Sequence, residues 1–198
     1  MSGKFIVLEG LDGAGIRTQA VLLAKYLDSK GFKVFTTKEP TAGILGGLSK
    51  AALNGEWSLS DRALQLLFCA DRAHHLDTEI EPRLEKGKIV ISDRYIFSTL
   101  AYGFASKINY KWLRAINLSF RKPDLGIVVD IKPTTSMLRT SEAPQSLQLF
   151  DNLEKIQKVR QMYLHIAKEF HLKVVDGEDS IDNVSSRINA IVDKFLRN

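Results

Sequence analysis

The chain has 198 residues, of which 44% are hydrophobic and 26% are charged. This composition is typical of a folded globular protein and excludes a collagen-like or disordered chain, and the length predicts one domain, residues 1–198. The formal net charge of +5 fits a mildly basic surface or phosphorylated small substrates. The sequence contains no run of about five Lys or Arg residues, the pattern that would indicate a nucleic-acid partner.

One cysteine and the start of the chain bear on where the protein works. Cys69 alone cannot form an intrachain disulfide or a multi-cysteine metal site, and its apolar helical surroundings predict core packing. Residues 1–4 lack the charged and apolar regions of a signal peptide, and no stretch reaches the ~18 apolar residues of a membrane span. We therefore predict a cytoplasmic protein without a membrane segment.

Strand-like and helix-like patterns alternate along the chain. Residues 5–9 predict a strand that ends in a glycine-rich turn, and apolar side chains at helical spacing in residues 18–30 predict a helix closed by Gly31. The same patterns predict strands at residues 33–37, 89–92, 125–131 and 173–176, one or two helices at residues 59–85, and helices at residues 152–170 and 181–196. The strands are continuous apolar runs, so we predict a three-layer α/β fold of the P-loop NTPase type, with a five-stranded parallel sheet flanked by helices.

The least regular stretch is residues 132–149, which is polar and contains prolines. It lies between the fourth predicted strand and a long predicted helix. Two interpretations are open: a plain connecting loop, or a mobile lid over an active site at about residues 133–150.

The glycine-rich segment after the first strand lies where open parallel sheets bind ligands. In a phosphate-binding loop, G-x-x-x-x-G-K-[ST], backbone amides and a helix N-terminus hold phosphates, the lysine reaches the β and γ phosphates, and the hydroxyl binds Mg²⁺. Here the glycine spacing is correct, but Ile16 occupies the lysine position and Arg17 the hydroxyl position. The residues predicted to bind the phosphates of ATP are Gly10, Leu11, Asp12, Gly13, Ala14, Gly15, Ile16, Arg17 and Thr18.

The two replacements affect charge neutralisation more than phosphate binding. A cation aimed at the transferred phosphoryl group can be worth about 10³ to 10⁵ in rate. Arg17 restores a positive charge and Thr18 a hydroxyl, each one position late, and consecutive helix positions point about 100° apart. Arg17 therefore has two interpretations, a compensating cation or an exposed residue of the first helical turn.

Four motifs resemble those of the thymidylate kinase family, in the family's order. The first, E-G-x-[DE]-G-x-G-K-[ST]-T-Q, corresponds to residues 9–19, and the second, R-E-P-[GT], to residues 38–41. The third, L-L-F-x-A-x-R, corresponds to residues 66–72. The fourth, D-R-Y followed by S-x-x-A-Y, corresponds to residues 93–95 and 98–102. The resemblance covers nearly the whole chain.

The resemblance implies transfer of a phosphoryl group from ATP to thymidine monophosphate with Mg²⁺, in a homodimer. It implies that Phe68 stacks on the thymine ring, Arg72 hydrogen-bonds the base and Arg94 holds the acceptor phosphate. Asp93 is similar to the family's acid near the metal. The residues implied for the monophosphate are Asp12, Glu39, Phe68, Arg72, Arg94 and Tyr102, and those implied for the metal, directly or through water, are Asp93 and Glu39.

The chain also departs from the family in the lid and after the fourth motif. The family usually has a basic residue just before an F-E or Y-E pair; residues 150–151 fit the pair, but residues 148–149 are not basic. Arg139 is the only basic residue in residues 133–150 and is the remaining candidate for a lid arginine. Gly103 stands where the family has a glutamine that contacts the base. The candidate catalytic residues are Asp12, Arg17, Arg94 and Arg139.

Several of these side chains also have a purely structural interpretation. On an apolar helix face Phe68 would by default be a core residue, and Arg72 and Arg94 could belong to surface ion pairs. His74 and His75 are adjacent and therefore diverge on a helix, which is more typical of surface histidines than of metal ligands.

Two functions are compatible with these observations. The first is a working thymidylate kinase that uses Arg17, Arg139 and backbone amides in place of the usual cations. The second is a catalytically weak or inactive nucleotide-binding paralogue, indicated by the loss of the lysine, the hydroxyl and the lid base. The retained acceptor-side residues, such as Arg94 and Tyr102, favour the enzyme.

Overall fold

The computed structural model describes residues 3–141 and 153–197. Within them, five parallel strands form one sheet in the order β2-β3-β1-β4-β5. These strands are β1 (Lys4–Gly10), β2 (Val34–Lys38), β3 (Ile89–Asp93), β4 (Leu125–Asp130) and β5 (Lys173–Asp176). The predicted α/β fold class is therefore confirmed.

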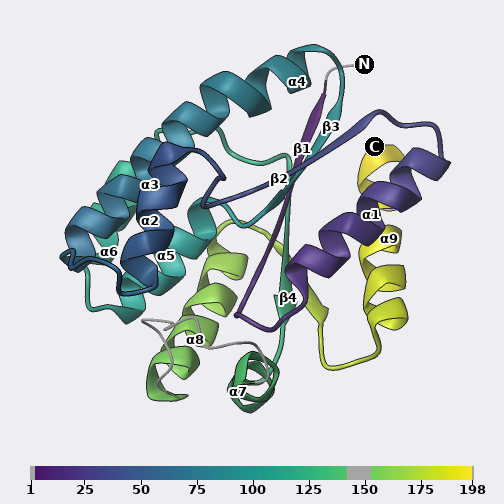
Figure 1. The fold of residues 1–198 in the computed structure, drawn as a ribbon. Coiled ribbons are helices and arrows are strands. Elements are labelled where there is room, and N and C mark those ends of the chain that lie inside the picture. The colour runs from purple at the N-terminus through teal and green to yellow at the C-terminus, as the bar shows by residue number, and fades with distance from the viewer. Residues whose placement is uncertain (1–2, 142–152, 198) are drawn as a thin grey trace.

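Helices surround this sheet. They are α1 (Ile16–Ser29), α2 (Ile44–Leu53), α3 (Asp61–His75), α4 (Glu81–Glu85), α5 (Ile96–Ala105), α6 (Tyr110–Asn117), α7 (Pro133–Ser141), α8 (Leu153–Glu169) and α9 (Ile181–Arg197), and the π-helical segment η1 (Leu76–Ile80) joins α3 to α4. Figure 1 shows α1 and α9 together on one side of the sheet, and α5 and α8 on the other. The sheet is therefore covered on both faces.

Strand β1 lies at the centre of the sheet because its sequence is apolar on both faces. Its side chains from Phe5 to Leu8 are fully buried, and each such burial contributes roughly 1.5–3 kcal/mol. In register, Leu8 pairs with Asp93 of β3 on one side and with Ile127 of β4 on the other. The carboxyl end of β1, Gly10, therefore opens between the ends of its two neighbouring strands.

The helical prediction for residues 59–85 is confirmed as a nearly continuous run from α3 through η1 to α4. The helices predicted at residues 18–30, 152–170 and 181–196 correspond to α1, α8 and α9. The sequence patterns do not predict α2, α5 and α6. Among the described helices, none is long and apolar enough to cross a membrane.

The interpretation of residues 132–149 as an irregular loop is wrong for its first part, which forms helix α7. Pro133 occupies the first position of this helix, where a missing backbone N–H costs nothing. The hydroxyl of Thr140 donates a hydrogen bond to the backbone carbonyl of Ser136, so a polar composition is compatible with this helix. The remainder of the predicted lid, residues 142–150, lies outside the described residues.

Candidate active site

The segment after β1 forms a glycine-rich loop at the carboxyl edge of the sheet. Gly15 is the N-cap of α1, and no side chain caps this helix end or adds an acidic group to its first turn. The first backbone N–H groups of α1 and the positive end of its dipole are therefore available to an anion. This geometry suits phosphate binding.

The side chain at the lysine position of the loop faces the protein interior. Ile16 is 4% exposed and packs in the main hydrophobic cluster, whereas Arg17 and Thr18 are exposed. A buried aliphatic side chain offers no charge to a phosphate. Any cation that neutralises the donor phosphates must therefore come from another position.

Basic side chains gather beside Asp93, the last residue of β3. Lys38 ends β2 and pairs in register with Asp93, so both side chains point to the same face of the sheet. Burial raises the pKa of Asp93, and the charges of Arg94, Lys38 and Arg17 oppose that rise. Burial also lowers the pKa of Lys50, and Lys38 and Arg17 lower it further. Several positive charges therefore lie close together at the edge of the sheet next to the loop, an arrangement that suits phosphates.

Two hydrogen bonds join helix α7 to the loop. Ser136 donates its hydroxyl to the carbonyl of Asp12 at 2.6 Å, and Arg139 donates Nη1 to the carbonyl of Gly13 at 3.1 Å. Gly13 has φ 79°, and a Cβ at this position would lie 3.1 Å from Cβ of Arg139. A larger residue at Gly13 would therefore push α7 away from the loop.

Arg94 directly follows the last residue of β3, and its side chain reaches the loop. Its backbone is left-handed, with φ 70°, a conformation that costs a non-glycine residue about 1–3 kcal/mol and is concentrated at functional sites. Nη1 donates to the carbonyl of Gly10 at 3.0 Å, to the hydroxyl of Ser98 at 3.0 Å and to that of Tyr163 at 3.2 Å. The guanidinium is thus held at the end of β1.

Asp12 connects the loop to Arg94 and to α5. One carboxylate oxygen accepts from Nη2 of Arg94, and the other accepts from the hydroxyl of Tyr102 at 3.0 Å. The guanidinium also lies 5.4 Å from the centre of the Tyr102 ring. Burial, followed by the charge of Asp12, raises the pKa of Tyr102, which stays neutral. Three predicted site residues are therefore brought together at the loop.

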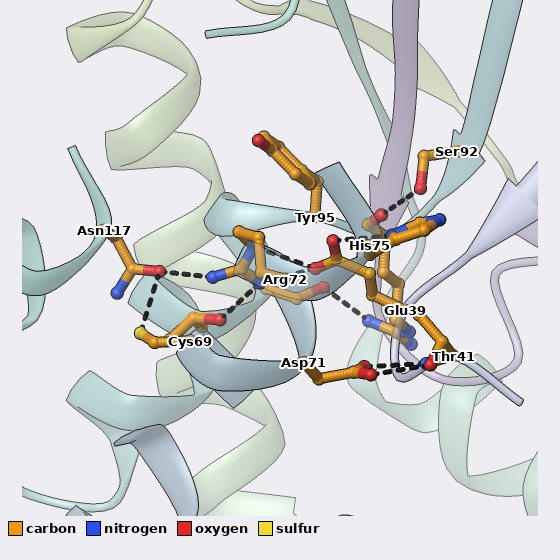
Figure 2. A network of polar contacts seen from close by, with 12 residues as sticks. Glu39, Thr41, Cys69, Asp71, Arg72, His75, Ser92, Tyr95 and Asn117 are labelled. Carbon is orange, nitrogen blue, oxygen red and sulfur yellow. Dashed lines mark hydrogen bonds and ion pairs between the residues drawn. The ribbon is translucent and has the colours of Figure 1, made fainter. Parts of the chain in front are cut away.

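A second polar network surrounds Arg72 on α3 (Figure 2). Arg72 is 2% exposed and donates Nε and Nη2 to one carboxylate oxygen of Glu39, at 2.9 and 2.7 Å. Its Nη1 donates to the side-chain oxygen of Asn117, and Nη2 also donates, at 3.0 Å, to the hydroxyl of Thr99. Arg72 is therefore not a surface ion-pair member, and these bonds hold its guanidinium in a fixed orientation.

The same network fixes the segment that follows β2. The other carboxylate oxygen of Glu39 lies 3.1 Å from Nδ1 of His75, and Asp71 accepts from the backbone and the hydroxyl of Thr41 at 2.8 and 2.6 Å. The prediction that both histidines lie on the surface is wrong for His75, which is 2% exposed, although His74 is exposed. The described residues contain no group of three or more side chains suited to a metal.

Phe68 lies one turn before Arg72 and on the same side of α3. It is half-buried and, within the described residues, lies outside the main hydrophobic cluster, whereas Cys69 beside it is buried. Gly103 is buried, and a Cβ there would meet a methyl of Leu113 at 2.7 Å. The absence of a side chain at residue 103 is therefore matched by close packing of α6 against α5.

Four further residues contribute to the site and are not among the predicted ones: Glu9, Ser98, Ser136 and Tyr163. Glu9 and Ser98 stand inside the first and fourth motifs, so those motifs could have indicated them. Ser136 and Tyr163 lie in helices far along the chain and carry no local signal.

A parallel sheet with a glycine-rich loop between its central strand and the first helix, and basic side chains at the same edge, is typical of P-loop kinases. The comparison with known families narrows this class. The family model for thymidylate kinase matches residues 8–188. The chain therefore belongs to the thymidylate kinase family, and the resemblance of the four motifs is confirmed.

Relatives align over nearly the whole chain. A probable thymidylate kinase from Pyrococcus horikoshii is 42% identical over 200 residues, which cover 97% of both chains. A probable thymidylate kinase from Pyrobaculum aerophilum is 34% identical over 198 residues, covering 98% of both. A thymidylate kinase from Caldicellulosiruptor saccharolyticus is 32% identical over 204 residues, covering 100% of this chain and 99% of the relative. Membership of this family of kinases implies ATP as the phosphate donor and thymidine monophosphate as the acceptor.

Proposed function

We propose that this chain is catalytically active and transfers the γ-phosphoryl group of ATP to thymidine monophosphate, giving thymidine diphosphate for dTTP synthesis, despite its altered loop. The observation that carries the proposal is the set of contacts among Asp12, Arg94 and Tyr102 beside the glycine-rich loop. An arginine fixed next to a phosphate cradle can hold the acceptor phosphate in line with the donor.

On the donor side, the loop amides and the N-terminus of α1 bind the ATP phosphates. Arg17 and Arg139 replace the charge that Ile16 lacks. Arg17 is supported by its exposure and by its action on Asp93, and Arg139 by its bond to the carbonyl of Gly13. Both can therefore approach phosphates bound at residues 10–18.

On the acceptor side, Arg94 binds the monophosphate, and Asp12 orients the guanidinium of Arg94. The thymine ring stacks on the half-exposed Phe68 and accepts a hydrogen bond from Arg72. Glu39 acts in this proposal through its ion pair with Arg72, which fixes the orientation of the guanidinium.

Asp93 is the side chain that fits Mg²⁺ in this site. Mg²⁺ keeps several waters and binds proteins through one or two carboxylates together with substrate phosphates, so one half-buried carboxylate beside the loop suits it. Thr18 offers a hydroxyl at the end of the glycine-rich loop. The carboxylate of Glu39 is engaged by Arg72 and His75, so its contribution to the metal site is through water at most. When bound, the ion would neutralise charge on the transferred phosphoryl group.

The alternative function is a nucleotide-binding paralogue with little or no catalysis. The observation that favours it is the burial of Ile16, which leaves the lysine position without a cation. In that case the monophosphate pocket binds its ligand and no transfer follows.

The test is ADP formation with ATP, Mg²⁺ and each deoxynucleoside monophosphate in turn, for the unmodified protein and for the variant Ile16→Lys with Arg17→Ser. We expect turnover by the unmodified protein, highest with thymidine monophosphate, and turnover roughly tenfold or more faster by the variant, because the long side chain of a lysine can extend from the buried position and place its ammonium at the transferred charge. Ile44→Lys is the matched control, since Ile44 is 85% exposed on α2. Turnover by the variant alone would identify the paralogue.

The assembly and the compartment follow from the family resemblance. We infer a homodimer that works in the cytoplasm. Light scattering at micromolar concentration tests the dimer, and a monomeric mass would contradict it.

A further inference from the structure

Glu9 is a fully buried carboxyl group beneath the phosphate loop, in the next-to-last position of β1. One of its oxygens accepts the backbone N–H groups of Tyr95 and Ser98, at 2.9 and 3.2 Å. The other accepts the hydroxyls of Ser98 and Tyr163, at 2.6 and 3.1 Å. Glu9 therefore caps the N-terminus of α5 from a neighbouring strand, where Tyr95 provides no side-chain cap.

The same two hydroxyls also touch Arg94. Its Nη1 lies 3.0 Å from the oxygen of Ser98 and 3.2 Å from that of Tyr163. A guanidinium can only donate, so both hydroxyls accept from Arg94, and each can direct its own hydrogen to Glu9 or, over 2.8 Å, to the other hydroxyl. Two hydrogen-bonded routes thus run from Arg94 through one hydroxyl each to one carboxylate oxygen.

The directions of these bonds favour an ionised Glu9. Two backbone N–H groups and two hydroxyls donate to Glu9, so a proton on either of its oxygens would face another donor. Protonation therefore makes at least one hydroxyl either break its contact or turn its hydrogen to the other hydroxyl and accept from Glu9. Either change weakens the hold of Ser98 or Tyr163 on Arg94. The network has two states, in which Arg94 is held or released.

The charge on Glu9 is sensitive to pH near neutrality. Burial raises the pKa of Glu9 to about 7, against the hydrogen bond from Ser98 and the charge of Arg94, which favour the ionised form. The hydroxyl of Tyr163 faces Glu9 from α8, and its pKa is raised by burial, so it stays neutral. Beyond Arg94, the charge of Asp12 and the neutral Tyr102 complete the surroundings.

We infer that Glu9 is a positioning residue for acceptor binding: its carboxylate, acting through Ser98 and Tyr163, holds Arg94 where it meets the monophosphate, and protonation of Glu9 releases Arg94. This inference rests on the proposed role of Arg94. It goes beyond that role because it makes acceptor affinity depend on a group that never touches the substrate.

The test is calorimetric titration of thymidine monophosphate into the unmodified protein and into Glu9→Gln at pH values on both sides of 7. The unmodified protein should lose about tenfold in affinity from the alkaline to the acidic side, which equals about 1.4 kcal/mol. Glu9→Gln should bind about tenfold more weakly at alkaline pH and show no such transition. The second ionisation of the phosphate, at about pH 6, affects both proteins equally and cancels in their ratio.

Two further variants separate positioning from folding. Tyr163→Phe keeps the ring and removes one route, so its affinity should fall while the transition near pH 7 persists through Ser98. Asp193→Asn is the matched control, because Asp193 on α9 accepts from Tyr26 of α1 and from Lys30 just after α1, and none of the three contacts Glu9 or Arg94. It should bind like the unmodified protein.

The outcomes are distinguishable. If Glu9→Gln unfolds at a lower temperature but keeps the affinity and the pH transition of the unmodified protein, Glu9 is only a helix cap and the inference is overturned. If the unmodified protein binds no thymidine monophosphate at any pH while ATP still binds, the proposed function itself fails, and the inference fails with it.

Discussion

Arg94 combines a strained backbone with a guanidinium whose contacts all lie at the end of β1. Its partners are the Gly10 carbonyl, Asp12 and the hydroxyls of Ser98 and Tyr163. Of these partners, only Asp12 carries a negative charge, and its side chain is 36% exposed to solvent. An entering phosphate can therefore replace Asp12 as the partner of Arg94 without moving the other contacts.

Replacement of Arg94 by Ala should weaken the binding of thymidine monophosphate by roughly 10- to 100-fold, because a hydrogen bond to a charged group is worth about 1.5–3 kcal/mol. Arg94→Lys should lie between, since lysine keeps the charge but not the fork geometry. Arg121→Ala, which removes an ion pair with Glu81 at 2.6 Å, is the control. Calorimetry measures all three. Unchanged affinity in Arg94→Ala would remove this residue from the site.

How far the site could be predicted depends on where each residue lies in the sequence. Asp12, Arg94 and Tyr102 stand in motifs at the ends of strands or just beyond them, and parallel strands bring such ends together. Tyr163 lies in the middle of α8, 65 residues from Ser98, and only tertiary packing brings it to Glu9. The sequence shows that Ile16 replaces a lysine, but only the structure shows that its side chain is buried.

Among the elements, the strands are predicted well because continuous apolar runs bounded by turns survive any tertiary arrangement. Helix α5 is missed because it is buried on nearly every side, which removes the amphipathic period. Helix α2 contains Gly46, a poor helix former, where a Cβ would lie 2.3 Å from the carbonyl of Thr41. In both helices, close packing rather than helical propensity or amphipathic spacing determines which residue types occur, and the sequence patterns therefore miss them.

Helix α7 provides a prediction at this scale, because it brings Arg139 to the loop. Arg139→Ala should lower turnover at saturating ATP by roughly tenfold or more if its charge neutralises the donor phosphates. Arg139→Gln keeps a donor of similar length for the Gly13 carbonyl without the charge. Steady-state kinetics with both variants decide the question. Equal losses assign the effect to charge, whereas recovery in Arg139→Gln would show that packing of α7 alone matters.

For the whole molecule, ionisable groups fall into two sets that affect stability in different pH windows. The pKa values of Asp179 and Asp193 are lowered, chiefly by hydrogen bonds from Asn183 and Lys30 respectively, so their contributions disappear as the pH falls below the ordinary carboxyl range. Their side chains are 33% and 22% exposed, and ion pairs this close to the surface contribute little. Glu9 is the opposite case, because its folded-state pKa is raised by burial.

A carboxyl group that binds its proton more tightly in the folded state stabilises the fold below its unfolded pKa, and this contribution disappears as the pH rises through its folded pKa. For Glu9 that window runs from 4.5 to about 7. At about 1.4 kcal/mol per pKa unit, the free energy of unfolding should fall by up to about 3 kcal/mol across it because of Glu9. Burial of Asp93 adds a change in the same direction.

Urea unfolding of the unmodified protein and of Glu9→Gln over this pH range measures the difference directly. Because Asp93 and the exposed carboxyls are common to both proteins, subtraction leaves the contribution of Glu9. The unmodified protein should lose stability relative to the variant as the pH rises from 4.5 to about 7. Parallel curves would show that Glu9 ionises in the folded state as it does in the unfolded chain, and the network around Arg94 would then have no switch that titrates near pH 7.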